Sequence, residues 1–501
     1  MTPFLRTSPS DYINGEFLPI PGDALVSTNP ANPGEIIWSG KPDATHVDAA
    51  VRAARAAFPA WSGLDRSERV EHLTSWQQVV RSNAERIADL ICAENGKTIA
   101  EAKAEAGALA SKVDITLEPD GSIQRVTDYE VRISDTRVGR CSFRPHGVVA
   151  VIGPFNFPAH LPNGHWIPAL AMGDTIVFKP SEKTAAVGQL LAELWHEVGL
   201  PRGVFNLVQG AGDVAARLVD HDDLDAVMFT GSWPVGRKIL ETNLDRPGRL
   251  IALEMGGNNP AVVMDDAHLR QAVIECVRAG FATTGQRCTC TRRVIVHEPV
   301  ANRFLDAFVK AAGTIRVGPG RSEPPVFCGP LINDAAVQSV LDFQQSIAAR
   351  GGRILLEAHR PEGLEGHFIT PGVVQVDRFQ LDQDCEIFGP LVQVSIARDL
   401  DDAIEQANAT RFGLAAAIFT TNQSSADRFV RECRAGCVNV NNGTAGASSK
   451  LPFGGLGASG NHRPAGAFSL DYCVHPVASL QEGSDEAAAP AGMEFDDAWL
   501  G

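Results

Sequence analysis

The chain has 501 residues, with 44 Lys and Arg against 60 Asp and Glu, which gives a formal net charge of −16 at pH 7. Hydrophobic residues make up 44% and charged residues 21%, a balance that excludes disordered, collagen-like and coiled-coil proteins and predicts about two to four globular domains. Because the chain has no dense run of Lys and Arg, neither nucleic acid nor an anionic membrane is expected as a partner.

The lengths of the apolar runs and the spacing of the cysteines indicate the cellular compartment of the protein. No stretch of about 18 consecutive apolar residues occurs, and the N-terminal segment lacks the basic start and apolar run of a signal peptide. We therefore expect a cytoplasmic protein with no membrane span. The ten cysteines form no CxxC pair, so no zinc or other metal site is predicted and the thiols are expected to be reduced.

Helices are expected first, from Ala44 to Leu117. Thr45 with Asp48, and Asp65 with Glu68, have the spacing of capping boxes, in which a side-chain oxygen and a carboxylate satisfy the free N–H groups of a first turn. Apolar residues then recur at helical spacing, which predicts one buried stripe: Val70, Leu73, Trp76, Val80, Ile87 and Leu90.

From Gly147 the pattern changes to short β-branched runs that alternate with helical segments. The runs are GVVAVIG, TIVF, GVFNLV, DAVMF and RLIALE, starting at residues 147, 175, 203, 225 and 249. Such alternation predicts a parallel sheet buried on both faces, whose ligands bind at the carboxyl ends of the strands. A second alternating region, from Ala261 to about Ala416, predicts a second α/β domain.

Two further segments have their own patterns. Residues 124–145 alternate polar and apolar side chains like a two-stranded ribbon, for which the segment from Leu470 to Leu480 is the expected partner. The last twenty residues are rich in Ala, Gly, Pro, Glu and Asp, and we expect them to form a mobile acidic tail.

The segment TTGQRCTC, from Thr283 to Cys290, has the character of a nucleophile site. A cysteine beside Arg287 in a glycine-containing turn is accessible and has a cation that stabilises its thiolate, which favours Cys288 over Cys290. The alternative is a small buried hydrophobic residue.

Two more polar residues follow predicted strands. Glu254 in LEMGGNNP would point into the ligand crevice and serve as a base toward water, unless it is an ordinary surface carboxylate before a turn. Asn156 in GPFNFP, held between aromatic residues and prolines, could donate to a developing oxyanion, or be an unremarkable loop residue.

Nucleotide-binding features lie at other strand ends. In FKPSE, Lys179 and Glu182 suit the hydroxyls of a ribose, the Glu repelling a 2′-phosphate, although an exposed Lys–Glu pair is the alternative. GAGDVA, from Gly210 to Ala215, and GSWPVG, from Gly231 to Gly236, compete for the pyrophosphate, and we favour the second because it opens a helix.

Seven motifs taken in order resemble the aldehyde dehydrogenase superfamily over roughly residues 10 to 480: PFNFP, KPSE, FTGSxxxG, LEMGGNNP, GQRCT, EIFGP and PFGG. The resemblance implies an α/β fold of three parts followed by a tail. These are an NAD-binding parallel-sheet domain (residues 1–122 and 146–254), a catalytic α/β domain (255–467), an oligomerisation ribbon (123–145 and 468–484) and the acidic tail (485–501).

The resemblance also implies roles for individual residues. Cys288 would be the nucleophile, Glu254 the general base and Asn156 the oxyanion donor. The cofactor NAD would be bound by three groups of residues: Lys179 and Glu182 at the ribose, Gly231, Ser232, Trp233, Pro234, Val235 and Gly236 at the pyrophosphate, and Glu386 and Phe388 on the nicotinamide side. A Cys288 thioester would be hydrolysed to a free acid, since Glu254 is present.

Longer segments, LPNGHWIPAL, EMGGNNP, GQRCTC and FGGLGASGNHRP, are similar to a subgroup that oxidises N-succinylglutamate 5-semialdehyde in arginine metabolism. The chain departs from the family at His165, where many members have Lys, and in having Trp233 and Pro234 in the phosphate turn; Asn439 to Lys450 departs from the subgroup pattern. Another semialdehyde dehydrogenase (glutamate or succinate), a cofactor-independent cysteine hydrolase and a nucleotide-binding protein without catalysis stay open as alternatives.

A dianionic semialdehyde approaching an acidic protein needs local cations. We expect its carboxylates to meet Arg287, His462 or Arg463, with backbone N–H groups of Gly454 to Gly460. The resemblance further implies a homo-oligomer, either a dimer or a tetramer.

Overall fold

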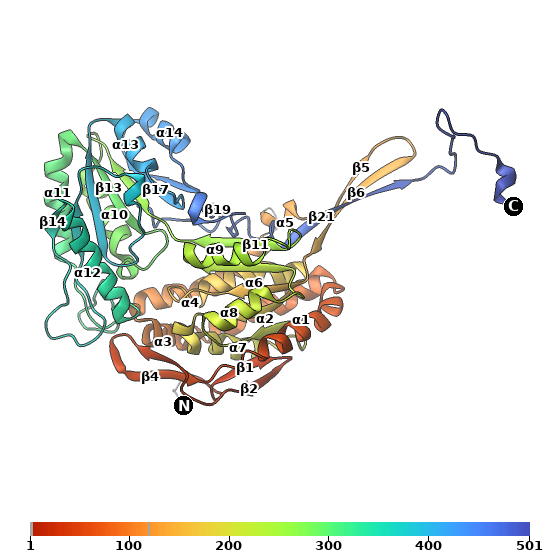
Figure 1. Cartoon of the computed structure of the whole chain (residues 1–501), viewed down its shortest axis with the longest axis horizontal. Coiled ribbons are helices and arrows are strands. Elements are labelled where there is room, and N and C mark those ends of the chain that lie inside the picture. Colours follow the sequence, from red (N-terminus) through yellow and green to blue (C-terminus); the bar gives the residue numbers. More distant parts are fainter. Residues whose placement is uncertain (1–3, 119–120) are drawn as a thin grey trace.

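A computed structural model describes residues 4–118 and 121–501. Figure 1 shows two α/β lobes side by side and a long ribbon that projects away from both, ending in the C-terminal tail. Residues 1–3 and 119–120 of the predicted NAD-binding segment lie outside the described part. The two lobes and the ribbon agree with the α/β fold class predicted from the motifs.

The first lobe is built on a seven-stranded sheet in the order β11-β10-β7-β8-β9-β1-β2. Its five parallel strands are the five predicted runs: β7 (Val148–Ile152), β8 (Thr175–Lys179), β9 (Phe205–Leu207), β10 (Ala226–Gly231) and β11 (Leu250–Met255). Two N-terminal strands that the sequence analysis missed, β1 (Ser10–Ile13) and β2 (Glu16–Pro19), extend the sheet in antiparallel pairing.

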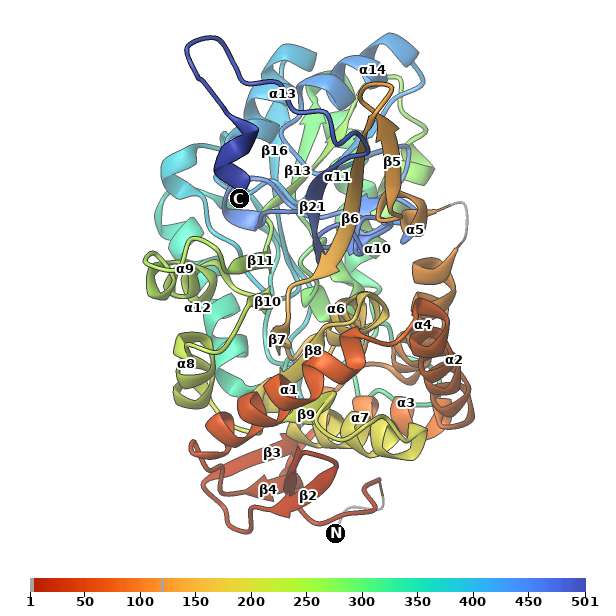
Figure 2. The ribbon, with the colours of Figure 1, turned by 90° about the vertical axis from the view of Figure 1, so that its right-hand side faces the viewer.

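Both faces of this sheet are covered by helices, because successive strand residues point to opposite sides. In β7, Val148 and Ala150 pack with α1 (His46–Ser62), α8 (Gly212–Asp220) and α9 (Trp233–Thr242), whereas Val149 and Val151 face the other helical layer. That layer contains α2 (Arg66–Ser82), α3 (Ala84–Asn95), α4 (Ile99–Leu117), α6 (His160–Met172) and α7 (Ala185–Val198). Figure 2 shows α8 and α9 on one side of the strands and α2 and α4 on the other.

The second lobe repeats this plan with the strand order β14-β15-β16-β13-β12-β17-β18. All neighbours are parallel except the first pair. The strands are β12 (Asn259–Val263), β13 (Thr291–His297), β14 (Arg353–Leu356), β15 (Gly372–Gln375), β16 (Leu391–Ala397), β17 (Ala415–Phe419) and β18 (Cys437–Val440). Helices α10 (Leu269–Phe281) and α11 (Glu298–Gly313) cover one face, and α12 (Asp334–Ala349), α13 (Leu400–Asn408) and α14 (Gln423–Glu432) the other.

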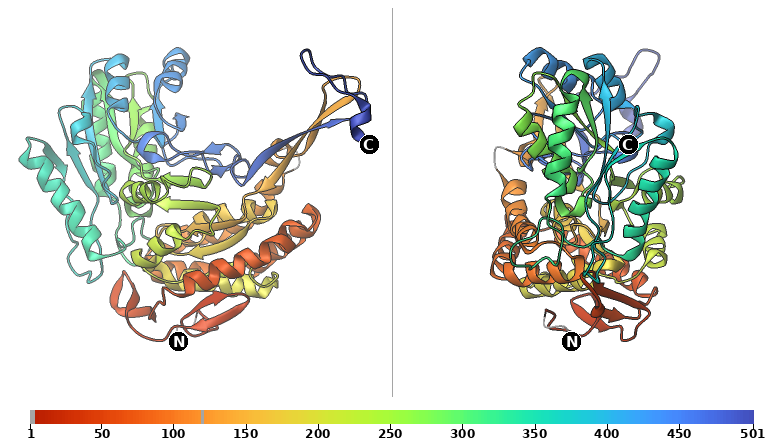
Figure 3. Two further views of the ribbon diagram at one scale, coloured as in Figure 1. Left: turned by 45° about the vertical axis from the view of Figure 1, so that its right-hand side comes forward. Right: turned by 90° about the vertical axis from the view of Figure 1, so that its left-hand side faces the viewer.

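The ribbon is a three-stranded antiparallel sheet of β5 (Tyr129–Arg132), β6 (Arg137–Pro145) and β21 (Val474–Glu482). The pairing of β21 with β6, from Val474 with Pro145 to Glu482 with Arg137, confirms the expected late partner. The prediction is wrong at the start of the ribbon, where residues 122–125 form the short helix α5 (Ser122–Arg125). Figure 3 shows how far the ribbon stands out from the body.

The helical prediction from Ala44 to Leu117 is confirmed, with one cap correct and one wrong. Asp65 and Glu68 make both bonds of a capping box. Thr45 does not cap α1, because its hydroxyl and its N–H both donate to Asp43 Oδ1, at 2.7 and 2.9 Å. Within the described residues, no helix has the length and apolar character that a membrane span requires.

The remaining strands form two small hairpins. They are β3 (Leu25–Asn29) with β4 (Asn32–Gly40), and β19 (Pro452–Phe453) with β20 (Ala465–Gly466). The second hairpin encloses the glycine-rich segment expected near the substrate.

Candidate active site

Four predicted residues lie at the carboxyl edge of the first sheet. Lys179 ends β8, Glu254 lies near the end of β11, and Asn156 and Ser232 follow β7 and β10. The strand register pairs Ile152 with Lys179 and Thr230 with Glu254, so these ends share one edge. This is where a parallel sheet binds its ligands.

Cys288 lies in the second lobe, on the turn between α10 and β13. We call this turn, residues 282–290, the nucleophile turn. The turn is irregular: Thr283 and Thr284 have φ values of +52° and +54°, and Gly285 has +72°. Such left-handed backbone is unfavourable for β-branched residues and persists only where surrounding contacts enforce it. Cys288 is partly exposed, whereas Cys290 is buried and its thiol contacts the Ala282 carbonyl. The accessible cysteine is therefore the one favoured by the sequence.

Direct contacts tie this turn to the first sheet. Asn156 Nδ2 donates to the Gln286 carbonyl at 3.0 Å. A Cβ on Gly257, three residues after Glu254, would lie 2.8 Å from the Cys288 carbonyl oxygen, so glycine is needed for this approach. The structure thus brings Asn156, Glu254 and Cys288 together.

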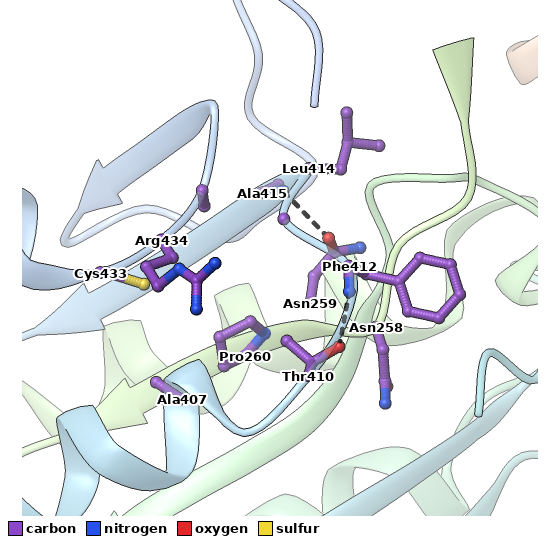
Figure 4. Close-up of a pocket in the computed structure, with 12 residues that line it drawn as sticks. Asn258, Asn259, Pro260, Ala407, Thr410, Phe412, Leu414, Ala415, Cys433 and Arg434 are labelled. Carbon is purple, nitrogen blue, oxygen red and sulfur yellow. Dashed lines mark hydrogen bonds between the residues drawn. The ribbon is translucent and has the colours of Figure 1, made fainter. Parts of the chain in front are cut away.

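Asn259 supports the nucleophile turn through its side-chain amide. It is one of the residues that line the small pocket in Figure 4. Its Nδ2 donates to the carbonyls of Cys288 (2.7 Å) and Cys290 (2.8 Å), and its Oδ1 accepts from the Ala415 N–H (3.0 Å). One buried amide therefore joins β12, β17 and the nucleophile turn.

The electrostatics of Cys288 favour the thiol over the thiolate. Burial raises its pKa first, and the charges of Glu254 and Glu386 raise it further, while Arg292 lowers it. Glu254 is 4% exposed, and burial raises its pKa to about 8. Its Oε1 has no hydrogen-bond partner among the residues described. A carboxyl that is easily protonated thus lies close to a thiol that must lose its proton.

Asn156 lies on the loop of residues 153–158, which we call the oxyanion loop. This loop is rigidly held. Asn95 Nδ2 donates to the Phe155 carbonyl at 2.6 Å, and Lys97 Nζ lies 3.4 Å from the centre of the Phe157 ring. Asn156 itself is 5% exposed. Since one of its two amide N–H groups is used by Gln286, the other can donate to an oxyanion without reorganisation.

Two helix N-termini compete for a pyrophosphate, and their first turns differ. Helix α9 begins after Ser232 with no side-chain cap and no acidic residue in its first turn, and Ser232, Pro234 and Val235 are exposed. Helix α8, in the GAGDVA segment, has Asp213 in its first turn, which repels phosphate. Gly231 and Gly236 allow close packing, since a Cβ on either would collide with Phe229 or Met255. The geometry favours the segment from Gly231 to Gly236, as the sequence does.

Lys179 is buried, and the side chain of Glu182 beside it is partly exposed. Lys179 Nζ donates to the Pro180 carbonyl at 2.7 Å and lies 3.9 Å from Glu182 Oε2, and burial lowers its pKa to about 8. The Glu182 side chain is 39% exposed, which leaves its carboxylate free to accept from two ribose hydroxyls. These residues fit an adenosine ribose.

Glu386 and Phe388 lie beside the catalytic loops. Glu386 Oε1 accepts from the Gly257 N–H at 3.0 Å, and a Cβ on Gly256 would collide with its carboxylate. Burial raises the pKa of Glu386. The Phe388 ring packs edge to face on Phe155, with centroids 5.9 Å apart. Phe388 is thus next to the Asn156 loop, and Glu386 is next to the glycines that follow Glu254.

The three predicted substrate cations are placed differently. Arg287 donates through Nε to Thr283 Oγ1 (2.7 Å) and its Nη2 lies 3.2 Å from Glu101 Oε1, so much of its guanidinium is already bound. His462 and Arg463 are exposed on a loop with φ values of +54° and +48°. The Asn461 N–H donates to the Leu253 carbonyl at 3.2 Å, which places this loop beside the strand that carries Glu254.

The sequence analysis assigned no role in the site to three residues that support it. Asn461 binds the edge of β11 through the Leu253 N–H (2.8 Å) and the Ile251 carbonyl (2.9 Å). His165 lies between Tyr472 Oη (2.7 Å) and Thr230 Oγ1 (3.1 Å), and burial lowers its pKa to about 3. Glu101 contacts the nucleophile turn. Of these three residues, only Asn461 and His165 lie in a sequence motif. Glu101 lies in none, so the sequence gave no indication of its role.

Comparison with known proteins identifies the family. The model of the aldehyde dehydrogenase family matches residues 21–477. The chain belongs to the aldehyde dehydrogenase family. It is 42% identical over 485 residues to the N-succinylglutamate 5-semialdehyde dehydrogenase of Chromobacterium violaceum, covering 96% of this chain and 98% of that protein.

Two solved structures extend the comparison. An E. coli protein described as an NADP-dependent enzyme is 32% identical with a TM-score of 0.89, covering 95% of this chain and 98% of that one. An indole-3-acetaldehyde dehydrogenase in complex with NAD+ is 29% identical with a TM-score of 0.90, covering 95% and 97%. The predicted fold and enzyme class are confirmed: the protein is an NAD(P)-dependent aldehyde dehydrogenase.

Proposed function

We propose that the protein oxidises N-succinylglutamate 5-semialdehyde to N-succinylglutamate with NAD, using Cys288, Glu254 and Asn156. The observation that carries the proposal is the meeting of these three side chains where the carboxyl edge of the first sheet faces the nucleophile turn. The choice of substrate is supported by the name of the relative from Chromobacterium violaceum.

The chemistry begins at the Cys288 sulfur. Since partial burial and two carboxylates raise the pKa of its thiol, the sulfur must lose its proton before it attacks, and the proton leaves to solvent, to which Cys288 is partly exposed. The free N–H of the Asn156 amide donates to the oxygen of the tetrahedral adduct on Cys288. A bound NAD supplies a hydride acceptor.

The second half of the reaction belongs to Glu254. As a carboxylate it removes a proton from water, and the resulting hydroxide attacks the Cys288 thioester, releasing the acid and the thiol. The unpartnered Oε1 of Glu254 is available for that water. In sum, the aldehyde and water become a carboxylic acid, and two electrons leave with the hydride.

The preference for NAD is part of the proposal. Lys179 and Glu182 would bind the adenosine ribose, and the exposed first turn of α9, from Ser232 to Gly236, would bind the pyrophosphate. A carboxylate at the ribose disfavours a 2′-phosphate by like-charge repulsion. Glu386 and Phe388 would border the nicotinamide.

We further propose that Arg287, His462 and Arg463 attract the substrate carboxylates. The NAD-binding, catalytic and ribbon segments are proposed as separate functional units with the boundaries predicted from the sequence.

We also propose that the protein forms a homo-oligomer. Apolar side chains on the ribbon support this, since Tyr129, Val131, Ile133, Val138 and Leu480 are each at least 40% exposed. The mass in solution should be a dimer or tetramer of the 53.4 kDa chain.

The test is NADH formation from purified protein with N-succinylglutamate semialdehyde, beside glutamate semialdehyde, succinate semialdehyde and simple aliphatic aldehydes. We expect a kcat/KM at least about 10-fold higher for the succinylated compound, because its extra carboxylate adds a charge-assisted contact. Equal rates would retain the enzyme class and contradict the substrate. Ester hydrolysis that is independent of NAD, with no NADH from any aldehyde, would favour the hydrolase alternative.

A further inference from the structure

The turn that carries Cys288 contains two strained residues that need external support. Thr283 and Thr284 both occupy the left-handed region, which β-branched side chains rarely adopt. Thr284 is held by its hydroxyl, which donates to the Gly329 carbonyl at 2.9 Å. Whatever holds Thr283 fixes the direction in which the chain leaves for Cys288.

That support comes from Glu101, in the first turn of α4. Its Oε1 accepts from the Thr283 N–H and from Thr283 Oγ1, both at 2.8 Å, and from Arg287 Nη2 at 3.2 Å. Arg287 Nε donates back to Thr283 Oγ1 at 2.7 Å. One carboxylate oxygen thus closes a hydrogen-bonded ring around the turn, and the ring ends at the residue before Cys288.

Glu101 is itself fixed, and its helix also reaches the oxyanion loop. Thr98 Oγ1 donates to Glu101 Oε2 at 3.1 Å. One turn further, Glu105 accepts from the N–H groups of Ala159 (3.0 Å) and His160 (3.1 Å), just after the Asn156 loop, and pairs with the buried Lys97. Residues four apart share one helix face and lie about 6 Å apart along the axis.

We propose that Glu101 is a positioning residue for the reaction: with Glu105 on the same face of α4, it sets the nucleophile turn in register with the oxyanion loop, so that Cys288 faces Asn156. The inference deepens the proposed function and rests on it. Glu101 does not contact the reacting atoms, and it acts through Thr283 and Arg287. Its loss therefore slows the attack of Cys288 rather than weakening the binding of NAD.

The experiment compares Glu101→Ala and Glu101→Gln in the full chain with Glu85→Ala as the control. Glu85 is an exposed glutamate in the first turn of α3, so the control also removes a carboxylate from the first turn of a helix. Each variant is assayed for the rate of the NADH burst, for KM, for alkylation of Cys288 by iodoacetamide and for thermal melting. The aldehyde is the best substrate of the panel above.

We expect Glu101→Ala to slow the burst and the alkylation by about 10- to 100-fold, because a displacement of about 1 Å has effects of this size. The KM for an anionic aldehyde should not rise, since Arg287 then loses its carboxylate partner and keeps its bond to Thr283. Glu101→Gln should recover most of the rate, because its amide oxygen still accepts from Thr283. Glu85→Ala should behave like the wild type.

The inference is overturned if Glu101→Ala melts like the wild type and keeps its burst rate. Should Glu101→Ala fail to fold, Thr283→Val decides: it keeps the shape of the side chain and removes its hydroxyl bonds, and an unchanged burst rate would contradict the inference. Cys288→Ala separates the two proposals. NADH formation that survives in Cys288→Ala contradicts the proposed function, whereas a Cys288-dependent burst that ignores Glu101 and Thr283 contradicts this inference alone.

Discussion

The two sheets supply the active site in different ways. The first sheet contributes Asn156, Lys179 and Glu254 at or directly after the ends of regular parallel strands, where strand order alone brings them to one edge. The second contributes Cys288 on an irregular turn whose backbone is held by Asn259 and Glu101. Regular strand ends fix where a cofactor and a base can lie. The strained turn fixes how far the sulfur is from them.

The difference leads to an ordered set of expectations. Changes that remove a reacting group or alter its alignment should reduce rate strongly, and changes at the cofactor end of the first sheet should alter affinity modestly.

Glu254→Gln should lower steady-state turnover by about 10²- to 10⁴-fold, the range expected for the loss of a general base. The first turnover should still release NADH, because hydride loss precedes hydrolysis of the thioester. Rapid-mixing measurements of NADH check this through a burst of one equivalent per active site. Loss of the burst together with turnover would assign Glu254 to the first half of the reaction as well.

The same group predicts the pH dependence. A pKa of about 8 means that Glu254 is mostly protonated at pH 7, and only its carboxylate accepts a proton. Wild-type turnover should therefore rise as the pH increases through about 8. Glu254→Gln should lack this rise, and a wild-type profile that is flat between pH 6.5 and 9 would contradict the role of the base.

Asn156→Ala should lower kcat by about 10²- to 10³-fold, as the loss of one oxyanion donor does. The substitution also removes the bond to the Gln286 carbonyl, so part of the effect reflects the spacing between the two sheets. Binding of NAD, measured by quenching of tryptophan fluorescence, should be unchanged. A normal kcat would remove Asn156 from the reaction.

Glu182→Ala should raise the KM for NAD about 10-fold, because hydrogen bonds between a charged group and the ribose hydroxyls are lost. The ratio of kcat/KM for NAD to that for NADP should fall, since the carboxylate that repels a 2′-phosphate is gone. Steady-state assays with both cofactors check the change. An unaltered ratio would show that another residue sets the cofactor preference.

The sequence predicted the parts of the site that depend on local pattern. The five runs became β7 to β11, since buried parallel strands read as continuous apolar segments, and each polar residue just after a run reached the ligand edge. The choice of α9 over α8 followed from the helix start at Ser232, and the structure adds Asp213 as a physical reason.

The parts that could not be predicted depend on distant contacts. Glu101 is 182 residues from Thr283, and Asn461 is 208 residues from Leu253, so no local spacing connects them. Arg287 looked like a free cation beside the nucleophile because Glu101 is absent from its neighbourhood in the chain. Thr45 failed as a cap because Asp43, two residues earlier, offered a competing acceptor.

The pairing of β6 with β21 has a consequence for biosynthesis. Arg137 and Glu482, at one end of this pairing, are 345 residues apart, so β6 emerges from the ribosome long before its partner exists. At roughly 5 to 20 residues per second, that interval lasts on the order of 20 to 70 s. During this time one edge of β6 has unpaired N–H and C=O groups, open to any neighbouring chain. Nascent chains kept apart by chaperones or sparse polysomes should therefore give more native enzyme than chains synthesised side by side on dense polysomes.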